Sequence, residues 1–234
     1  MLSSIPARLV LSPLLVAQAI QVRRRALILP EPDGPRHGVA GAGPMLRVLI
    51  AGDSSAAGVG VSHQDQAISG QLVAGLAPHF TVHWRLEART GDTTAKALAR
   101  LSALTPAPFD VALTALGVND VTHQRPLRRW LAEQQAISAL LRERWGVRAQ
   151  WRAGLPPMQG FPLLPRPLRD VLGAQAVRFD RALAAVSIGS VHHHPFDPSR
   201  LDPSMMARDG FHPGPSIYAA WGAELAAMIR AELA

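Results

Sequence analysis

The chain has 234 residues, 48% of them apolar, which is enough for one well-buried α/β domain and too apolar for a disordered chain. It contains no cysteine, so disulfides, cysteine-ligated metals and thiol catalysis are excluded. The formal net charge is +7, but the basic residues are nearly all arginines scattered along the chain, with Lys96 the only lysine. Because clustered charge and basic–aromatic repeats are missing, nucleic acid is not expected as a partner.

Residues 1–44 differ in composition from the rest, and we expect an N-terminal region there ahead of one domain over residues 45–234. Residues 9–22 are mostly apolar and are followed at once by Arg23, Arg24 and Arg25. The apolar run is shorter than the ~20 residues that span a bilayer. Residues 31–44, rich in proline and glycine, are expected to be a linker.

Three interpretations of the apolar segment remain open. Residues 9–25 are an anchor that lies on a membrane surface, a poor signal sequence, or a helix packed on the domain. Residues 17–19 could pass as a signal-peptidase site, but arginines immediately downstream fit a secreted protein poorly. We therefore expect a membrane-associated or domain-packed helix, and a cytoplasmic or membrane-associated protein in preference to a secreted one.

From residue 45 on, strand and helix patterns alternate. Short apolar, β-branched runs predict buried parallel strands at residues 46–51, 81–86, 111–116 and 147–153. Apolar residues at helical spacing predict helices near residues 68–76, 94–101, 126–141, 167–186 and 215–228. This alternation predicts an α/β fold with a parallel sheet covered by helices on both faces.

Polar residues follow three of the predicted strands. Ser54 comes directly after the first strand, Gly91 after the second, and Asn119 after the third. Ligands of such a sheet bind at the carboxyl ends of the strands. We therefore expect these residues to share one site.

Ser54 is the candidate nucleophile of this site, because a serine in a tight turn between strand and helix exposes its hydroxyl. The plainer interpretation is a common turn with serine as a helix cap, and Ser55 is a nearby competitor. His212 is the candidate base, with Asp209 three residues earlier to orient the imidazole. The alternative for this pair is an aspartate that caps the last helix beside a surface histidine.

Asn119 and Gly91 are candidate donors to an oxyanion, together with the N–H of Ser54. An asparagine amide offers two uncharged donors, and glycine leaves its backbone N–H unobstructed. Asp53 and Asp120 are expected to hold their loops by hydrogen bonds.

Four segments resemble the sequence blocks of the SGNH hydrolases, also called the GDSL esterase/lipase family, and occur in the family order: Gly52-Asp53-Ser54, Gly91, Gly117-Val118-Asn119-Asp120 and Asp209-Gly210-Phe211-His212. The resemblance implies a flavodoxin-like three-layer α/β/α sandwich with a central parallel sheet. It also implies a catalytic triad of Ser54, His212 and Asp209, and an oxyanion hole of Ser54, Gly91 and Asn119.

The activity that this resemblance implies is that of a serine esterase, which hydrolyses small-molecule carboxylic esters of short-to-medium acyl chains through an acyl-enzyme, without cofactor or metal. A thioesterase, a lysophospholipase or a carbohydrate acetylesterase could use the same machinery. A membrane-tethered binding module without catalysis is a further alternative. Ser55 stands where one family name has leucine, and Asp92 would place a carboxylate near the oxyanion pocket.

The sequence also allows an interpretation of two other segments. Residues 192–194 are consecutive histidines, which cannot easily converge on one metal ion, and a solvated loop is expected there. Residues 155–169 are rich in proline and large apolar residues, and either pack against the sheet or line an acyl pocket. The sequence does not fix the oligomeric state.

Overall fold

A six-stranded sheet forms the centre of the computed structural model, which describes residues 5–234, with side chains from residue 11 onward. The strand order is β1-β3-β2-β4-β5-β6. The strands are β1 (His37–Ala40), β2 (Met45–Gly52), β3 (Thr81–Ala88), β4 (Val111–Ala115), β5 (Ala149–Ala153) and β6 (Val191–His194). β2 to β6 all run parallel to one another, and β1 pairs antiparallel with β3 at the edge of the sheet.

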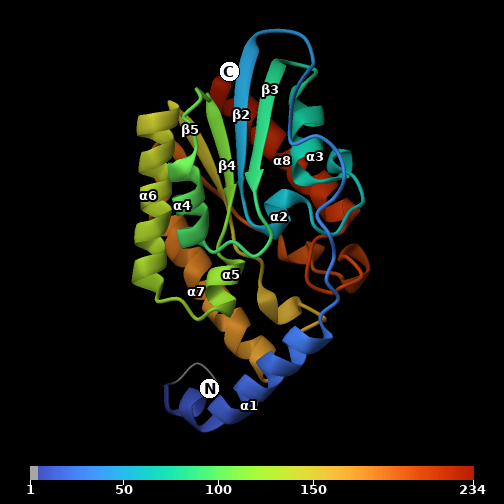
Figure 1. Ribbon diagram of the computed structural model, residues 1–234, viewed down its shortest axis with the longest axis vertical. Helices are drawn as coiled ribbons and strands as arrows, with labels where there is room; N and C mark the ends of the chain where they lie inside the picture. Colours follow the sequence, from blue (N-terminus) through green and yellow to red (C-terminus); the bar gives the residue numbers. More distant parts are fainter. Residues whose placement is uncertain (1–4) are drawn as a thin grey trace.

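Helices cover both faces of this sheet (Figure 1). On one face, Val48 and Ile50 of β2 pack in a core with α3 (Ile68–Leu76) and α8 (Pro215–Leu233). On the other face, Leu49 and Ala51 pack against α4 (Thr94–Ala103) and α6 (Leu127–Trp145). Because successive side chains of a strand point to opposite faces, the apolar run Val48 to Ala51 of β2 supplies both cores. The predicted three-layer α/β/α architecture is confirmed.

A third apolar cluster lies near the carboxyl ends of the strands. It contains Trp130 of α6 and Phe179 of α7 (Leu168–Ala185), whose ring centroids are 4.7 Å apart. The short helices α2 (Ser54–Ala57) and α5 (Val118–Thr122) begin at this end of the sheet. Single turns of 3-10 helix occur at Gln64–Gln66, Met158–Gly160, Pro198–Arg200 and Pro203–Met205.

The N-terminal helix α1 (Ile5–Arg25) packs on this third cluster through Leu15 and Val22. Gln18 adds two hydrogen bonds: its Nε2 donates to the carbonyl of Arg166 at 2.6 Å, and its Oε1 accepts from the N–H of Leu168 at 3.0 Å. Among residues 5–234, no helix is both long and apolar enough to cross a bilayer. Residues 1–4 of the predicted N-terminal region lie outside the described residues.

The expectation that residues 31–44 form a linker is wrong for the central part of this segment. Residues 37–40 form strand β1, which pairs with residues 82–85 of β3. Upstream, Glu31 accepts hydrogen bonds from Arg36 and from the N–H of Thr90, both at 2.8 Å. The composition of residues 37–40 does not predict this strand, because its partner β3 lies more than 40 residues away. Only the pairing with β3 makes this glycine-containing segment extended.

At the opposite end of the sheet, the carboxylate of Asp110, just before β4, joins the starts of β2 and β5. It accepts hydrogen bonds from the backbone and side chain of Arg47 at 2.8–3.0 Å, and from Arg148 at 3.0 Å. The hydrogen bond from the Arg47 side chain is the main cause that lowers the pKa of Asp110 from 3.8 to about 2.

We expect Asp110→Asn to lower the free energy of unfolding at neutral pH by about 2 kcal/mol. The folded protein stabilises the ionised carboxylate of Asp110, and the neutral amide of asparagine cannot gain that stabilisation. A depressed pKa stabilises the fold above the unfolded value of 3.8, and the contribution is lost as the pH falls toward 2. Urea unfolding across this range should therefore show the difference between the two proteins shrinking with acid. A difference independent of pH would contradict the assignment.

Candidate active site

Ser54 is the first residue of α2, directly beyond the end of β2, and is mostly buried. The preceding Asp53 caps this helix by accepting the N–H of Ser55 at 3.0 Å. Gly52 allows β2 to end close to β4, because a Cβ at this position would lie 2.4 Å from the carbonyl oxygen of Ala115. The glycine and aspartate ahead of the serine thus shape the turn that presents its hydroxyl.

His212 lies between Ser54 and Asp209. Its Nε2 is 2.8 Å from the Oγ of Ser54, and its Nδ1 is 2.5 Å from the Oδ2 of Asp209. Since an ionised carboxylate only accepts hydrogen bonds, Nδ1 carries the imidazole proton and Nε2 accepts from the serine hydroxyl. This is the arrangement in which a histidine can take the proton of a serine nucleophile.

The carboxylate of Asp209 is held firmly in place. Its Oδ1 accepts the backbone N–H groups of Phe211 and His212, both at 3.0 Å. Burial by itself would raise the pKa of Asp209, but the hydrogen bonds from the side chain and backbone of His212 outweigh it and hold the pKa below its usual value. The residue therefore stays ionised and can stabilise an imidazolium beside it.

The predicted oxyanion donors lie at the ends of β3 and β4. Gly91 has a φ of +80° in a turn closed by the N–H of Asp92 on the carbonyl of Arg89. The Nδ2 of Asn119 donates to the carbonyl of Asp92 at 3.0 Å and lies 3.5 Å from the Oδ2 of Asp53. Asn119 thus joins the turn that contains Gly91 to the residue before the serine.

Asp53 and Asp120 are buried and hold loops, as expected. The Oδ2 of Asp120 accepts the N–H and the hydroxyl of Thr94, at 2.9 and 2.8 Å. Asp53 accepts from Ser55, and its burial raises its pKa from 3.8 to about 6. Burial also raises the pKa of Asp120. Both carboxylates therefore fix the loops around Ser54 at a cost in desolvation.

The competitor Ser55 and the flanking Asp92 are both engaged elsewhere. The hydroxyl of Ser55 donates to Asp53 at 2.9 Å, not to His212. The carboxylate of Asp92 is 3.0 Å from the Nε of Arg100 in α4. The carboxylate that Asp92 was expected to place near the oxyanion pocket is thus neutralised by Arg100.

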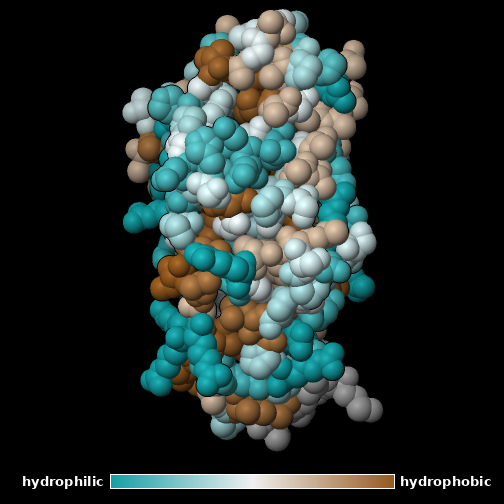
Figure 2. Space-filling view, turned by 90° about the vertical axis from the view of Figure 1, so that its right-hand side faces the viewer, coloured by the Kyte–Doolittle hydropathy of each residue, from teal (hydrophilic) through white to brown (hydrophobic). Residues whose placement is uncertain are grey.

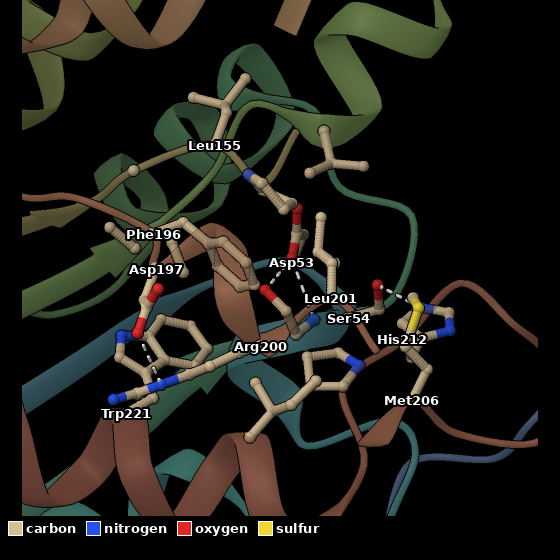
Figure 3. Close-up of a pocket in the computed structure, with 18 of the residues that line it drawn as sticks. Asp53, Ser54, Leu155, Phe196, Asp197, Arg200, Leu201, Met206, His212 and Trp221 are labelled. Carbon is tan, nitrogen blue, oxygen red and sulfur yellow. Dashed lines mark hydrogen bonds and ion pairs between the residues drawn. The ribbon is translucent and has the colours of Figure 1, made fainter. Parts of the chain in front are cut away.

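A cavity of about 920 Å³, including its open mouth, extends from Ser54 over the carboxyl ends of the strands. Most of its wall is apolar, and Leu155, Leu201 and Met206 are seen in Figure 3. Phe161 and Ile217 also line it. Leu155, Pro156 and Phe161 line this cavity, while Leu164 and Leu168 are buried in the third cluster. The segment 155–169 thus lines the cavity at its start and packs with residues of α6 and α7 further on.

A second polar group lines the cavity far from Ser54, near β6 and α8. Figure 3 shows Asp197 and Arg200 beside Trp221, away from Ser54. Glu224 bridges Arg200 and His194, whose Nε2 is 3.3 Å from the carboxylate. β6 is three strands from β2, which corresponds to roughly 14 Å. The cavity thus has one end at Ser54 and His212 and one charged end at Arg200 and Glu224.

The solvated loop expected for residues 192–194 is wrong, because these histidines form β6. His192 stacks on Trp151 with ring centroids 4.8 Å apart, and the Nε2 of His193 is 2.8 Å from Asp180. Within the described residues, no group of histidine and carboxylate side chains could hold a metal ion.

Sequence reasoning missed three residues of this region. Glu224 and Arg200 reach the cavity from α8 and from a 3-10 turn, and neither belongs to a recognisable motif. Asp180 of α7 accepts the N–H of Leu155 at 2.9 Å and so fixes the start of the cavity wall. The spacing of Glu224 from Ile217 and Trp221 on one face of the last helix was the only available signal.

The sequence and the fold are similar to those of known ester hydrolases. A model of the GDSL-like Lipase/Acylhydrolase family matches residues 50–220. No curated protein matches the sequence. Among solved structures, the psychrotrophic esterase EstA from a Pseudoalteromonas species is 20% identical, with a TM-score of 0.56, over 80% of this chain and 98% of that one.

Two further structures share the fold. The carbohydrate acetylesterase Est24 from Sinorhizobium meliloti is 17% identical, with a TM-score of 0.57, over 80% of this chain and 99% of that one. A carbohydrate esterase family 2 enzyme with a carbohydrate-binding domain, from Corynascus thermopiles (Myceliophthora fergusii), is 14% identical, with a TM-score of 0.63, over 86% of this chain and 68% of that one. At such identities these structures support the fold alone.

The position of Asn119 leads to a kinetic prediction. We expect Asn119→Ala to lower the kcat for p-nitrophenyl butyrate by about 10²–10³-fold with little change in KM, because the amide would act on the oxyanion and not on the bound ester. Gln135→Ala, an exposed amide on α6, serves as the matched control and should retain full activity. A loss confined to KM would remove Asn119 from the oxyanion hole.

Proposed function

The chain belongs to the GDSL-like lipase/acylhydrolase family and is a carboxylic ester hydrolase, and on that basis we propose that Ser54 is its nucleophile. The observation that carries the proposal is the unbroken hydrogen-bonded line from Asp209 through His212 to Ser54, with distances of 2.5 and 2.8 Å. Small-molecule esters are the expected substrates.

In the proposed reaction, the Oγ of Ser54 attacks the carbonyl carbon while its proton passes to the Nε2 of His212. The N–H groups of Ser54 and Gly91 and the amide of Asn119 stabilise the negative oxygen of the tetrahedral intermediate. When that intermediate collapses, the ester C–O bond breaks and His212 returns the proton to the leaving alcohol. Water then adds to the acyl-enzyme by the same steps, giving the acid and free Ser54.

The apolar wall of the cavity supports an acyl group of short-to-medium length. Leu155 and Phe161 come from the segment after β5, and Ile217 from α8, so the wall has contributions from both sides of Ser54. Such a surface gains free energy in proportion to the apolar area that the acyl chain buries. We infer that thioesters and lysolipids whose leaving group carries a phosphate are poorer substrates than esters without one. The far end of the cavity holds the carboxylates of Asp197 and Glu224, which would repel the phosphate.

A carbohydrate acetylester is the second candidate, favoured by the charged end of the cavity. Burial lowers the pKa of His194 although Glu224 opposes it, so His194 is neutral near pH 7. Arg200 then faces the carboxylates of Asp197 and Glu224 beside Trp221. Such a set accepts from and donates to hydroxyl groups, and an indole ring can pack on a sugar ring. Est24, which shares the fold, is named a carbohydrate acetylesterase.

We also propose that the enzyme is not secreted and that it works at a membrane surface, which residues 9–25 contact. This proposal rests on the surface of α1 and is independent of the catalytic site.

Substitution of the two adjacent serines tests the nucleophile. Ser54→Ala should lower hydrolysis of p-nitrophenyl butyrate by ~10³-fold or more and abolish labelling by a fluorophosphonate probe. Ser55→Ala is the matched control and should be labelled normally, because its hydroxyl contacts Asp53 and not His212. Labelling that survives in Ser54→Ala but not in Ser55→Ala would transfer the role to Ser55. An unlabelled wild-type protein would support a binding module instead.

Glu224→Gln tests the second candidate. We expect kcat/KM for an acetylated xylose to fall about tenfold or more, and that for p-nitrophenyl acetate to change less than about twofold, because the small ester does not reach the charged end. Glu232→Gln, on the same helix but outside the cavity, is the control. Equal losses on both substrates would show that Glu224 supports the fold and does not select the substrate.

A further inference from the structure

The N-terminal helix α1 has two distinct faces. Leu11, Leu15, Gln18 and Val22, spaced four, three and four residues apart, are all partly buried, and the last three contact the domain. Between them, Val16 and Ile20 point outward and are 58% and 48% exposed. A spacing of three and four residues places the first set on one side of a helix and the second on the other. Packing on the domain therefore accounts for the inner face of α1 but not for the exposed apolar residues on its outer face.

Other exposed apolar side chains lie near these residues in the sequence. Leu27 and Ile28 are 47% and 91% exposed, and Leu14 is 46% exposed. Half of the large apolar side chains that are exposed in the described part of the chain thus fall between residues 14 and 28. Clustered exposure of this kind indicates a contact surface, whereas single exposed apolar residues need no explanation.

The last turn of α1 is strongly basic. Arg23, Arg24 and Arg25 are exposed, and within residues 5–234 none of them forms an ion pair. The helix sequence contains no acidic residue, and the next one along the chain is Glu31. Three adjacent unpaired guanidinium groups beside exposed apolar side chains match a surface that is both negatively charged and apolar beneath.

α1 lies at the same end of the molecule as the catalytic site. Figure 1 shows it beyond the carboxyl ends of the strands, and in Figure 2 apolar side chains reach the surface at that end. The cluster on which Leu15 and Val22 pack includes Phe161 and Met206, which line the cavity. The helix therefore flanks the cavity that the substrate must enter.

The geometry points to a specific role, which rests on the proposed function: the outer face of α1 lies on an anionic lipid surface, and the substrates are esters dissolved at that surface. Val16, Ile20 and Ile28 enter the boundary of the acyl chains, and Arg23 to Arg25 contact lipid phosphates. The helix lies in the plane of the interface and does not cross the bilayer. An amphiphilic ester then moves from the lipid into the adjacent cavity without exposing its acyl chain to water.

Vesicle binding of the full chain tests this role. The wild-type protein should float with vesicles of phosphatidylcholine and phosphatidylglycerol, and far less with phosphatidylcholine alone or at high salt. The variant Arg23→Gln/Arg24→Gln/Arg25→Gln should need about 100-fold more lipid for half-maximal binding. Val16→Ser/Ile20→Ser should weaken binding to a similar extent at any salt concentration.

Three exposed arginines elsewhere provide the control. Arg128→Gln/Arg178→Gln/Arg181→Gln removes the same charge from α6 and α7 and should bind vesicles like the wild type. If the control loses as much binding as the α1 variant, vesicle binding depends on the net charge of the protein and not on the position of the arginines in α1. Equal binding to neutral and anionic vesicles would overturn the proposal. So would a dimer in sedimentation that Val16→Ser/Ile20→Ser converts to a monomer, because the face would then bind a second copy.

Activity separates this role from the ester chemistry. The arginine variant should hydrolyse soluble p-nitrophenyl butyrate at the wild-type rate, but should lose at least about tenfold on a fluorogenic ester embedded in anionic vesicles. Ser54→Ala should bind vesicles normally and hydrolyse neither substrate. Full activity of the arginine variant on the embedded ester would overturn the assigned substrate class and leave the nucleophile unaffected.

Discussion

The hydrogen bond between the Nε2 of His212 and the Oγ of Ser54 joins two residues 158 positions apart, and the site exists only while that contact is kept. Ser54 is set by the end of β2, whereas His212 precedes α8. The buried hydroxyl of Tyr218 in α8 donates to the carbonyl of Val59 at 2.8 Å, and the N–H of Val59 in turn bonds to the carbonyl of Ser54 at 2.9 Å. This chain of contacts fixes the last helix relative to the serine turn.

The same constraint explains why α8 packs so closely on α3. A Cβ on Gly222 would lie 2.5 Å from the Cβ of Gln71, so only glycine permits this separation. A wider helix pair would carry Tyr218 and the segment before α8 away from Ser54. A displacement of about 1 Å at a catalytic group is enough to cost much of the rate. A residue without a side chain, on the face remote from the chemistry, thus contributes to the position of His212.

The sequence predicted well those features that depend on local patterns. Continuous apolar runs predicted β2 and β4, and the residues at their ends, Ser54 and Asn119, follow directly from parallel strands. The features that were missed depend on distant partners. β1 is extended because it pairs with β3, and residues 192–194 form a strand because β5 receives them. No local rule predicts a strand from three adjacent histidines.

The wall of the cavity is fixed at both ends by residues that take no part in the proposed reaction. At its start, Asp180 holds the N–H of Leu155 and is itself held by His193. At its end, Gln18 of α1 bonds to the carbonyl of Arg166 and the N–H of Leu168. An apolar segment with many prolines forms few backbone hydrogen bonds of its own, so these side chains limit its freedom. α1 is thus structurally part of the cavity: whatever its outer face contacts, its inner face bears on the cavity wall.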